Sequence, residues 1–461
     1  YRWRPAAVNP FWQLEQHGAS SAVVTDSGAS CSYAQLAAAA DAWGQRLGPQ
    51  RQLIFLQCRN NLSSLAAYLA CLRQGHCVLL LAESLDPAQL RQLQQAFQPH
   101  WLIEADGAAQ PLSAPPLQDE GEAALLLSTS GSTGSPKQVA LSRQNLQANA
   151  ASILDYLQIG ADERPISSLP MHYSYGLSVI HSHLLAGACL LLTDKPLVSR
   201  EFWDFFRQQQ ATSLAGVPTS YELLERLRLE RLQLSSLRTL TQAGGRLAPE
   251  KVQRFARLAR EQGWRFFVMY GQTEAGPRMS YLPPELAEEF PDSIGIAIPG
   301  GRFSLLDDQG RTIEDINQTG ELIYRGTNVM LGYVSDRADL SQLEHPTQLH
   351  TGDLAYRNAQ GLYVITGRLK RFIKIHGHRL SLDEVEQWLQ QAGLDVRAAG
   401  RDERLVIAHR DADAAPAIQQ QLAKLGLQPR SYQLLWLQDW PLTANGKLAY
   451  EVLLGKAGLA D

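Results

Sequence analysis

The stretch Leu125–Lys137 reads LLLSTSGSTGSPK, an apolar run that passes directly into a loop of serine, threonine and glycine. Gly131 and Gly134 let the main chain approach an anion closely, so that its N–H groups can donate to phosphate oxygens. The hydroxyl groups of the loop are further donors, and Lys137 supplies a positive charge at its end. The pattern predicts a loop that binds the phosphates of a nucleoside triphosphate.

This loop differs from the Walker A sequence, G-x-x-x-x-G-K-[ST], because Pro136 and not glycine precedes Lys137. A kinase-like or Ras-like protein is therefore disfavoured. By composition alone a flexible Ser/Gly linker is the alternative. A linker, however, would not be expected between the buried-strand run Ala123–Leu127 and the amphipathic segment Asn145–Tyr156.

The composition is that of an ordinary globular protein. Of the 461 residues 45% are hydrophobic and 19% are charged, and the formal net charge of −4 gives no overall attraction to nucleic acid or to an anionic membrane. Five cysteines include no C-x-x-C pair, so we expect reduced thiols. Residues 1–12 contain no apolar signal-peptide core, and the longest apolar stretch, Leu184–Leu192, is too short to span a bilayer. We expect a cytoplasmic protein without membrane insertion.

The order of patterns along the chain predicts an α/β protein with a second, smaller domain. Strand-like and helix-like segments alternate up to about Pro291, which predicts layered parallel α/β subdomains, and short alternating strands then predict a β-rich lobe. We predict an N-terminal domain at 1–367, a hinge at 368–370 and a small, mobile α+β domain at 371–461. Expected strands are Leu53–Gln57, Val78–Leu81, Leu125–Leu127, Cys189–Leu192 and Phe266–Met269, and expected helices are Ser32–Leu47, Asn61–Arg73, Pro249–Gln262, Leu382–Gln391 and Ala415–Leu425.

Four further motifs place polar residues at turns. Tyr270-Gly271-Gln272-Thr273-Glu274 follows an apolar strand, and α/β sheets bind ligands at the carboxyl ends of their strands. Gly352-Asp353 offers a carboxylate that suits ribose hydroxyl groups. Residues 367–374 hold four cations, and the segment PLTANGK ends on Lys447 after an Asn-Gly turn. Each motif has an ordinary alternative, namely a structural turn, a solvated charged face or an exposed loop lysine.

The order of these motifs resembles that of the adenylate-forming superfamily of acyl- and aryl-CoA synthetases, nonribosomal-peptide adenylation domains and luciferase. The resemblance extends from SYAQLAAAADAWGQRL, starting at Ser32, through PMHYSYGL and GELIYRGTNVMLGY to WPLTANGK. Several independent motifs in one order are far more specific than any one of them. The resemblance implies ATP and Mg²⁺ as cofactors and an AMP-forming acid–thiol ligase as the activity.

The resemblance also implies a role for single residues. Lys447 would bridge the substrate carboxylate and the α-phosphate, Thr273 would donate to that phosphate, and Glu274 would bind the metal ion; with Lys137 these are the candidate catalytic residues. Lys370 would be the hinge and Gly377 would line the thiol tunnel. The candidate nucleotide-binding residues are Thr129, Ser130, Gly131, Ser132, Thr133 and Gly134 around the phosphates, Gly244, Gly245, Arg246, Tyr270 and Gly271 at the adenine, Asp353 and Arg368 at the ribose, and Arg379 near phosphate.

The segment that matches the family's acyl pocket contains no acidic side chain between Pro165 and Thr193. Amino-acid-activating members carry an aspartate there, so α-amino acids are disfavoured. An alkyl tail would leave buried imidazole and phenol groups without partners, so we expect an aryl or a short oxygenated acid. Whether His181 and His183 belong to the pocket or to the core stays open. The candidate substrate residues are His172, Tyr173, Tyr175 and Gly176.

Two departures from the family pattern are visible. Gln138 stands where family members usually have glycine, and the region AGRDERLVIAHRD looks short, which leaves the thiol-acceptor surface open. No carrier-protein segment follows, so we expect a free-standing ligase whose acceptor is a separate acyl carrier protein or coenzyme A. An amino-acid-activating enzyme is the alternative within the family, and a luciferase-like oxidoreductase or a non-catalytic AMP-binding protein is the alternative from another class.

Overall fold

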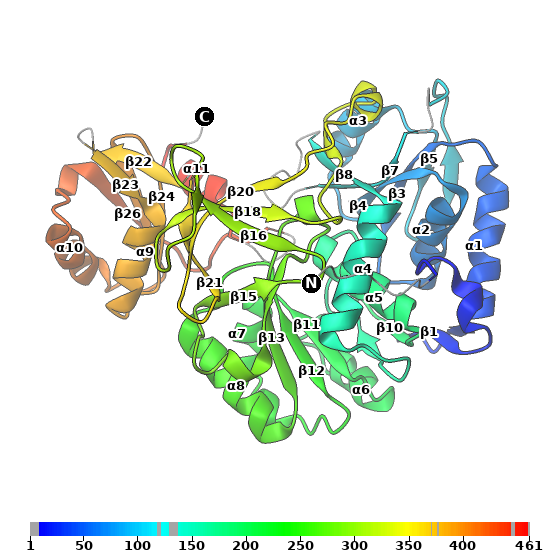
Figure 1. Cartoon of the computed structure of the whole chain (residues 1–461), viewed down its shortest axis with the longest axis horizontal. Coiled ribbons are helices and arrows are strands. Elements are labelled where there is room, and N and C mark those ends of the chain that lie inside the picture. The colour runs from blue at the N-terminus through cyan, green and yellow to red at the C-terminus, as the bar shows by residue number, and fades with distance from the viewer. Residues whose placement is uncertain are drawn as a thin grey trace. The chain divides into compact units, whose positions relative to one another are not determined.

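The computed structural model describes residues 9–117, 121–128, 137–369, 371–375, 378–443 and 448–459. The chain forms two compact units (Figure 1): unit 1 comprises Tyr1–Phe303 and Tyr324–Leu349, and unit 2 comprises Ser304–Ile323 and His350–Asp461. Both units combine helices with strands, which confirms the α/β class. The hinge at 368–370 stays a prediction, since Lys370 lies outside the described residues.

The first sheet of unit 1 has the strand order β19-β8-β7-β4-β3-β5-β6. Its central strands are parallel and apolar on both faces, as is usual for strands covered by helices on both sides. In β3, Ile54 and Leu56 face the core shared with α1 and α2, whereas Leu53 and Phe55 face the core shared with α3. The elements are α1 (Tyr33–Leu47), β3 (Leu53–Cys58), α2 (Leu62–Gln74), β4 (Cys77–Ala82), α3 (Pro87–Phe97), β5 (Trp101–Ile103), β6 (Ala109–Pro111), β7 (Ala123–Ser128), β8 (Gln138–Ser142), β19 (Gly332–Val334) and η5 (Ala338–Ser341).

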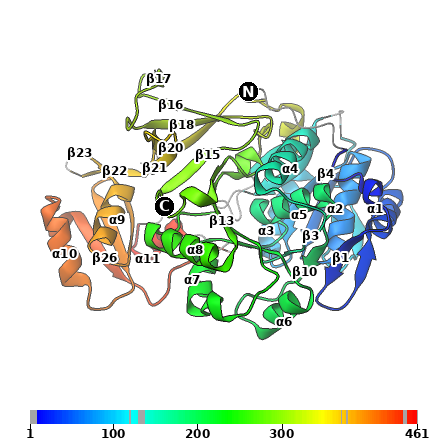
Figure 2. The same ribbon diagram turned by 60° about the horizontal axis from the view of Figure 1, so that its bottom comes forward.

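The second sheet of unit 1 has the order β15-β14-β13-β12-β11-β9-β10-β1-β2. α7 and α8 pack on β11 and β13, and α4 lies beside α5 in both views (Figures 1 and 2). The elements are η1 (Leu14–His17), β1 (Ser21–Thr25), β2 (Ser30–Ser32), α4 (Arg143–Leu157), β9 (Pro165–Ile166), α5 (Ser174–Ala186), β10 (Leu190–Leu192), α6 (Arg200–Gln208), β11 (Ser213–Gly216), α7 (Pro218–Arg226), η2 (Leu229–Arg231), β12 (Thr239–Gln242), α8 (Pro249–Gln262), β13 (Arg265–Tyr270), η3 (Thr273–Ala275), β14 (Ser280–Leu282), η4 (Pro284–Leu286) and β15 (Ser293–Ala297).

Local sequence signals explain where several helices begin. Ser32 and Ser142 cap α1 and α4: each side chain accepts from the main-chain N–H three residues on, and that residue's side chain bonds back to the serine N–H. The predicted strands and helices all occur within a few residues of their expected bounds. The sequence patterns predict a helix as the next element after the phosphate loop, however, and the structure has the strand β8 between them.

Unit 2 contains small sheets and three helices in its described part. The strand order β17-β16-β18-β20-β21 forms the β-rich lobe, β22 pairs with β23, and β24-β25-β26 forms a further sheet on which α9 packs. Leu389, Val396 and Ile418 centre its apolar core. The elements are β16 (Arg302–Leu306), β17 (Thr312–Ile313), β18 (Gly320–Arg325), β20 (Leu349–Arg357), β21 (Tyr363–Arg368), β22 (Phe372–Ile375), β23 (His378–Ser381), α9 (Leu382–Gln391), β24 (Val396–Arg401), β25 (Arg404–His409), α10 (Ala415–Lys424), η6 (Pro429–Ser431), β26 (Tyr432–Trp436) and α11 (Tyr450–Lys456).

All five cysteines lie among the described residues and are free. In the same described ranges, no helix has both the length and the apolar character needed to cross a membrane.

Candidate active site

The turn that follows β13 carries three of the candidate residues, Tyr270, Thr273 and Glu274. β13 is a buried parallel strand, so its carboxyl end is the expected place for a ligand. A side chain at Gly271 would place its Cβ 1.7 Å from the carbonyl oxygen of Pro277, so only glycine allows the chain to fold back here. The turn leaves Thr273 and Glu274 half-buried at the sheet edge.

Two asparagine side chains hold the far side of this turn. Asn149 of α4 donates from Nδ2 to the carbonyl oxygen of Arg278 at 2.9 Å. Asn328 donates from its own Nδ2 to the carbonyl oxygens of Ala275 at 2.6 Å and Arg278 at 3.1 Å. The main chain of Glu274 is also bound, because its carbonyl accepts from the N–H of Met330 at 2.8 Å. The turn around Glu274 is therefore fixed to two separate segments, α4 and residues 328–330.

The carboxylate of Glu274 is oriented by Tyr333 of β19. The Tyr333 hydroxyl donates to Oε1 of Glu274 at 2.8 Å, and burial together with the neighbouring carboxylate raises the pKa of Tyr333, so the phenol keeps its proton. The ammonium group of Lys137 lies 3.7 Å from the centroid of the same ring, a cation–π contact. Lys137, Tyr333 and Glu274 thus form one continuous chain of contacts.

The carboxylate of Glu274 fits a magnesium ion better than a metal that needs a complete protein cage. No group of three or more His, Cys, Asp or Glu side chains in the described ranges is arranged to hold a metal. Mg²⁺ is commonly held by one or two carboxylates while substrate phosphates and waters complete its shell. The carboxylate has one oxygen engaged by Tyr333, and Thr273 beside it has its hydroxyl 3.2 Å from that of Ser174.

The candidate adenine residues lie at two turns of unit 1. Gly244, Gly245 and Arg246 follow β12, and Gln242 holds this turn by donating from Nε2 to the carbonyl of Gly245 at 2.9 Å. Arg246 is exposed. Tyr270 is half-buried at the end of β13, with its ring 6.5 Å from that of Phe303.

The candidate substrate residues differ in their surroundings. The Tyr175 hydroxyl donates to Oγ1 of Thr241 at 2.9 Å, and Thr241 lines a small cavity between α5 and the strands β9, β11 and β12. Tyr173 is buried at the start of α5. Burial lowers the pKa of His172 to about 4, and its Nδ1 has no hydrogen-bond partner among the described residues. Gly176 lines a second recess, and a Cβ there would lie 2.4 Å from the carbonyl oxygen of Pro170.

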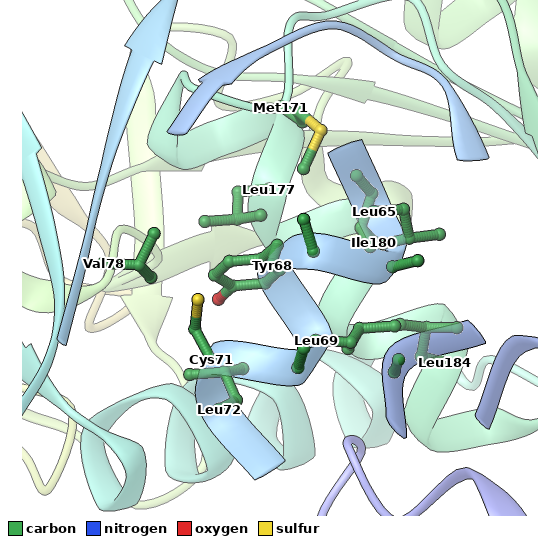
Figure 3. Close-up of a cluster of buried hydrophobic side chains, with 14 of the residues drawn as sticks. Leu65, Tyr68, Leu69, Cys71, Leu72, Val78, Met171, Leu177, Ile180 and Leu184 are labelled. Atoms are coloured by element: carbon green, nitrogen blue, oxygen red, sulfur yellow. The ribbon is translucent and has the colours of Figure 1, made fainter. Parts of the chain in front are cut away.

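His181 and His183, which the sequence places either in the pocket or in the core, lie in different surroundings. His181 belongs to the core: its Nε2 is 2.7 Å from the Tyr68 hydroxyl, and its ring stacks on Phe11 with centroids 4.2 Å apart. Figure 3 shows Tyr68 of α2 among Leu177, Ile180 and other apolar side chains. His183, in contrast, lines the cavity between α5 and the strands β9, β11 and β12. Burial lowers the pKa of His183 to about 4, so the ring is neutral at pH 7.

In unit 2, Asp353 and Arg368 form an ion pair. They face each other in the antiparallel pair β20 and β21, and Nε of Arg368 donates to Oδ1 of Asp353 at 2.7 Å. The Asp353 side chain is 2% exposed, whereas that of Arg368 is 60% exposed. The main-chain N–H of Arg368 donates to Oδ2 of Asp383 at 2.9 Å. The candidate ribose-binding carboxylate is therefore held in place by its neighbour.

Several candidates lie outside the described residues, namely Thr129, Ser130, Gly131, Ser132, Thr133, Gly134, Lys370, Gly377 and Lys447, and the Arg379 side chain does as well. The two ends of the phosphate loop are described, however. Ser128 pairs with Gln138 in the β7–β8 ladder, and the Ser128 hydroxyl donates to Oε1 of Gln138 at 2.8 Å. Gln138 is fully buried, so the residue that departs from the family pattern closes the base of the loop.

Two residues of this region were not singled out from the sequence. Tyr333 is the last residue of the motif GELIYRGTNVMLGY, and the resemblance to the family assigns it no role. Arg278 follows the YGQTE turn and is 2% exposed. Its signal in the sequence was a single charge between the turn and an apolar strand, and nothing in the sequence indicated that this charge would be buried.

The chain is similar in sequence to AMP-binding enzymes. A family model described as AMP-binding enzyme matches residues 97–334, more than half of the chain. The chain is 30% identical to indoleacetate–CoA ligase of Aromatoleum aromaticum over 338 residues, which are 70% of this chain and 65% of that protein. It is also 30% identical to luciferin 4-monooxygenase of Photinus pyralis over 277 residues, 58% of this chain and 49% of that protein. The matches thus span about half to two thirds of these relatives.

Among solved structures, the o-succinylbenzoate CoA synthetase of Bacillus subtilis in complex with its acyl-adenylate intermediate has a TM-score of 0.78 to this chain. The alignment covers 97% of this chain and 98% of that one at 21% identity. This likeness concerns the fold, and it confirms the α/β architecture over nearly the whole length.

Proposed function

The chain belongs to the AMP-binding enzyme family of the adenylate-forming superfamily, and from this premise we propose that it is an ATP-dependent acid–thiol ligase. In the first step a substrate carboxylate oxygen attacks the α-phosphorus of ATP, the bond to the β-phosphate breaks, and pyrophosphate leaves. In the second step a phosphopantetheine thiol attacks the acyl carbon and AMP leaves. The names of the relatives, a CoA ligase and an enzyme crystallised with its acyl-adenylate, support this order of steps.

The observation that carries the proposal is the fixed position of Glu274. Its main chain is bonded to Met330, the next residue is held by Asn328, and its carboxylate accepts from Tyr333. Attack of one anion on another requires preorganised positive charge and fixed geometry. When bound, Mg²⁺ would supply part of that charge, and Glu274 is the residue that would hold it.

The remaining roles are assigned by the motifs. Thr273 donates to the α-phosphate, the loop residues and Lys137 bind the outer phosphates, and Asp353 with Arg368 binds the ribose. Lys447 neutralises charge while the carboxylate attacks and is not needed when the thiol attacks. A separate small domain with a hinge at Lys370 suits a lysine that is needed in only one step.

The test is acid-dependent exchange of labelled pyrophosphate into ATP, followed by thioester formation with coenzyme A or with an acyl carrier protein as separate acceptors. We expect exchange with at least one carboxylic acid and loss of about 10²–10³-fold in Lys447→Ala, as for removal of one preorganised charge. Thioester formation from supplied acyl-adenylate should survive in that variant. Equal loss of both steps would contradict the role of Lys447, and absence of exchange with every acid would contradict the proposed function.

The same assay separates the alternatives. Best exchange with a proteinogenic amino acid would indicate an amino-acid-activating enzyme. Oxygen consumption that depends on the acid and on ATP would indicate luciferase-like chemistry. AMP binding without exchange would indicate a non-catalytic protein.

A further inference from the structure

Arg278 is a buried cation in the wall of the cavity beside α5. Its side chain is 2% exposed. Nε donates to the Ser178 hydroxyl at 3.2 Å, and Nη1 lies 3.1 Å from the Tyr156 hydroxyl and 2.9 Å from Sδ of Met269. The guanidinium carbon lies 4.4 Å from the centroid of the Tyr175 ring. All of these neighbours are uncharged.

No carboxylate balances this charge. Within the described ranges, no Asp or Glu forms an ion pair with Arg278, and its Nη2 has no hydrogen-bond acceptor there. The titratable groups that face it are Tyr156, Tyr173, Tyr175 and His183. The phenols have raised pKa values because of burial, and the pKa of His183 is lowered to about 4 by burial and by Arg278, so all four are neutral at pH 7. Buried charges in proteins are normally paired.

The same cavity contains one carboxylate, that of Glu163, which already has other partners. Glu163 lines the cavity, but it accepts from the Thr212 hydroxyl and lies 3.8 Å from Nη1 of Arg238. Arg265 also lines the cavity, and its Nη2 donates to the Thr239 hydroxyl at 3.0 Å. The cavity therefore carries more positive than negative charge. The space enclosed by these residues is small, which favours a short acid over a long one.

The position of Arg278 links the cavity to the candidate active site. Asn328 binds the carbonyl oxygens of both Ala275 and Arg278, so the turn that carries Glu274 continues directly into the cavity wall. On the opposite side, Ser174 at the start of α5 contacts Thr273, and Tyr175 contacts Arg278. An acid whose carboxylate reacts beside Thr273 would direct its other end between α5 and Arg278.

We propose that Arg278 binds a second carboxylate of the substrate, so that this protein activates short dicarboxylic acids in preference to monocarboxylic acids. The inference rests on the proposed ligase function and narrows its substrate class. The distal carboxylate supplies the counter-charge that the chain lacks, through charge-assisted hydrogen bonds from Nη2. A positively charged pocket also rejects an α-ammonium group, in agreement with the absence of acidic residues between Pro165 and Thr193.

The experiment compares acids that differ only in the distal group. Pyrophosphate exchange is measured with succinate, glutarate and adipate, with butyrate, valerate and hexanoate as their matches, and with 4-carboxyphenylacetate against phenylacetate. In the wild type we expect kcat/KM for the best diacid to exceed that of its monoacid by about 10–10²-fold, the size of a buried charged hydrogen bond. In Arg278→Met this ratio should fall to about one or below, mainly by loss of the diacid.

Two variants and one binding measurement serve as controls. Arg278→Lys keeps the charge and should retain part of the diacid preference. Arg260→Met removes a cation of α8 that pairs with Glu288 and does not line the cavity, so it should leave the preference unchanged. AMP binding by calorimetry should be equal in the wild type and in Arg278→Met, which shows that the variant is folded.

The outcomes separate the inference from the proposed function. Exchange with monoacids and not with diacids in the wild type would overturn the inference and leave the ligase function standing. Equal diacid preference in the wild type and in a folded Arg278→Met would also overturn it. Should Arg278→Met fail to fold, the ratio of diacid to monoacid activity in the wild type and in Arg278→Lys still tests the inference. No exchange with any acid would contradict the ligase function itself.

Discussion

Two arginines with little exposure lie against tyrosine rings, one in each unit, and they differ in their counter-charge. Arg371 of unit 2 lies 4.1 Å from the centroid of Tyr450 and forms ion pairs with Asp383 and Glu386. Arg278 of unit 1 lies 4.4 Å from the centroid of Tyr175 and has hydroxyl and sulfur neighbours only. Low exposure and an aromatic neighbour are therefore shared by both sites. The carboxylates beside Arg371 give it a structural role, whereas Arg278 lacks such a partner and is proposed to bind the carboxylate of a substrate.

The largest expected effect is on the paired site. Arg371→Met removes the cation shared by the largely buried carboxylates of Asp383 and Glu386, although Arg397 stays 3.9 Å from Glu386. Breaking a buried ion pair on one side costs about 3–5 kcal/mol. Hydrogen exchange of peptides from α9 and β24 should report this loss as a lower local unfolding free energy. Arg278→Met leaves no buried charge behind, so its cost in unit 1 should be about 1 kcal/mol or less. Equal losses in the two variants would contradict the comparison.

Lowering the pH should partly restore the stability that is lost in Arg371→Met. Burial raises the pKa of Asp383 and of Glu386, and Arg371 opposes that rise, so the variant should raise both values further. A carboxyl group with a raised folded-state pKa contributes stability that is present below its unfolded pKa of about 4 and is lost as the pH rises through the folded value. The difference between variant and wild type should therefore be smaller near pH 4 than at pH 7. A constant difference across this range would contradict the assignment.

A smaller effect, on catalytic activity, is expected at the contact between Lys137 and Tyr333. Lys137 lies over the ring of Tyr333, whose hydroxyl binds Glu274. Tyr333→Phe keeps the ring under Lys137 and removes the hydrogen bond, so pyrophosphate exchange should fall by about 10-fold, the equivalent of one hydrogen bond of about 1.4 kcal/mol. The requirement for Mg²⁺ should rise in the same variant. Unchanged activity and magnesium dependence would show that Tyr333 does not position Glu274.

The smallest effect concerns the ring beneath Arg278. Tyr175→Phe removes the hydrogen bond to Thr241 and retains the ring against the guanidinium. The expected cost in stability is about 0.5–1 kcal/mol, measured by denaturant unfolding, because Thr241 is left with a buried hydroxyl. The ratio of diacid to monoacid activity should stay at the wild-type value. A change in that ratio would assign the Tyr175 hydroxyl to the acid instead.

Patterns that depend on neighbouring residues were predictable from the sequence. The runs Leu53–Gln57 and Phe266–Met269 form buried parallel strands, and Ser32 begins a helix, because alternation, apolar content and capping are local properties. The order of several motifs gave the family. The strand β8 was missed because Gln138–Ser142 is a short run between a loop and a helix, and its partner strand β19 lies far away along the chain.

Properties that depend on distant partners were not predictable. His181 and His183 are two residues apart on one helix, yet one meets Tyr68 and Phe11 in the core and the other faces the cavity. Arg278 is buried only because α4, α5 and β13 converge on it. Neither the sequence around the YGQTE turn nor its periodicity contains this information.

The asparagine contacts of the turn have a consequence for how such a protein changes its specificity. Asn149 and Asn328 bind the carbonyl oxygen of Arg278 and leave its side chain uninvolved. These two hydrogen bonds to the main chain do not require an arginine side chain at position 278. Substitutions at this single position should therefore change which acid is bound while the position of Glu274 is kept. A new substrate specificity would then need only one mutation.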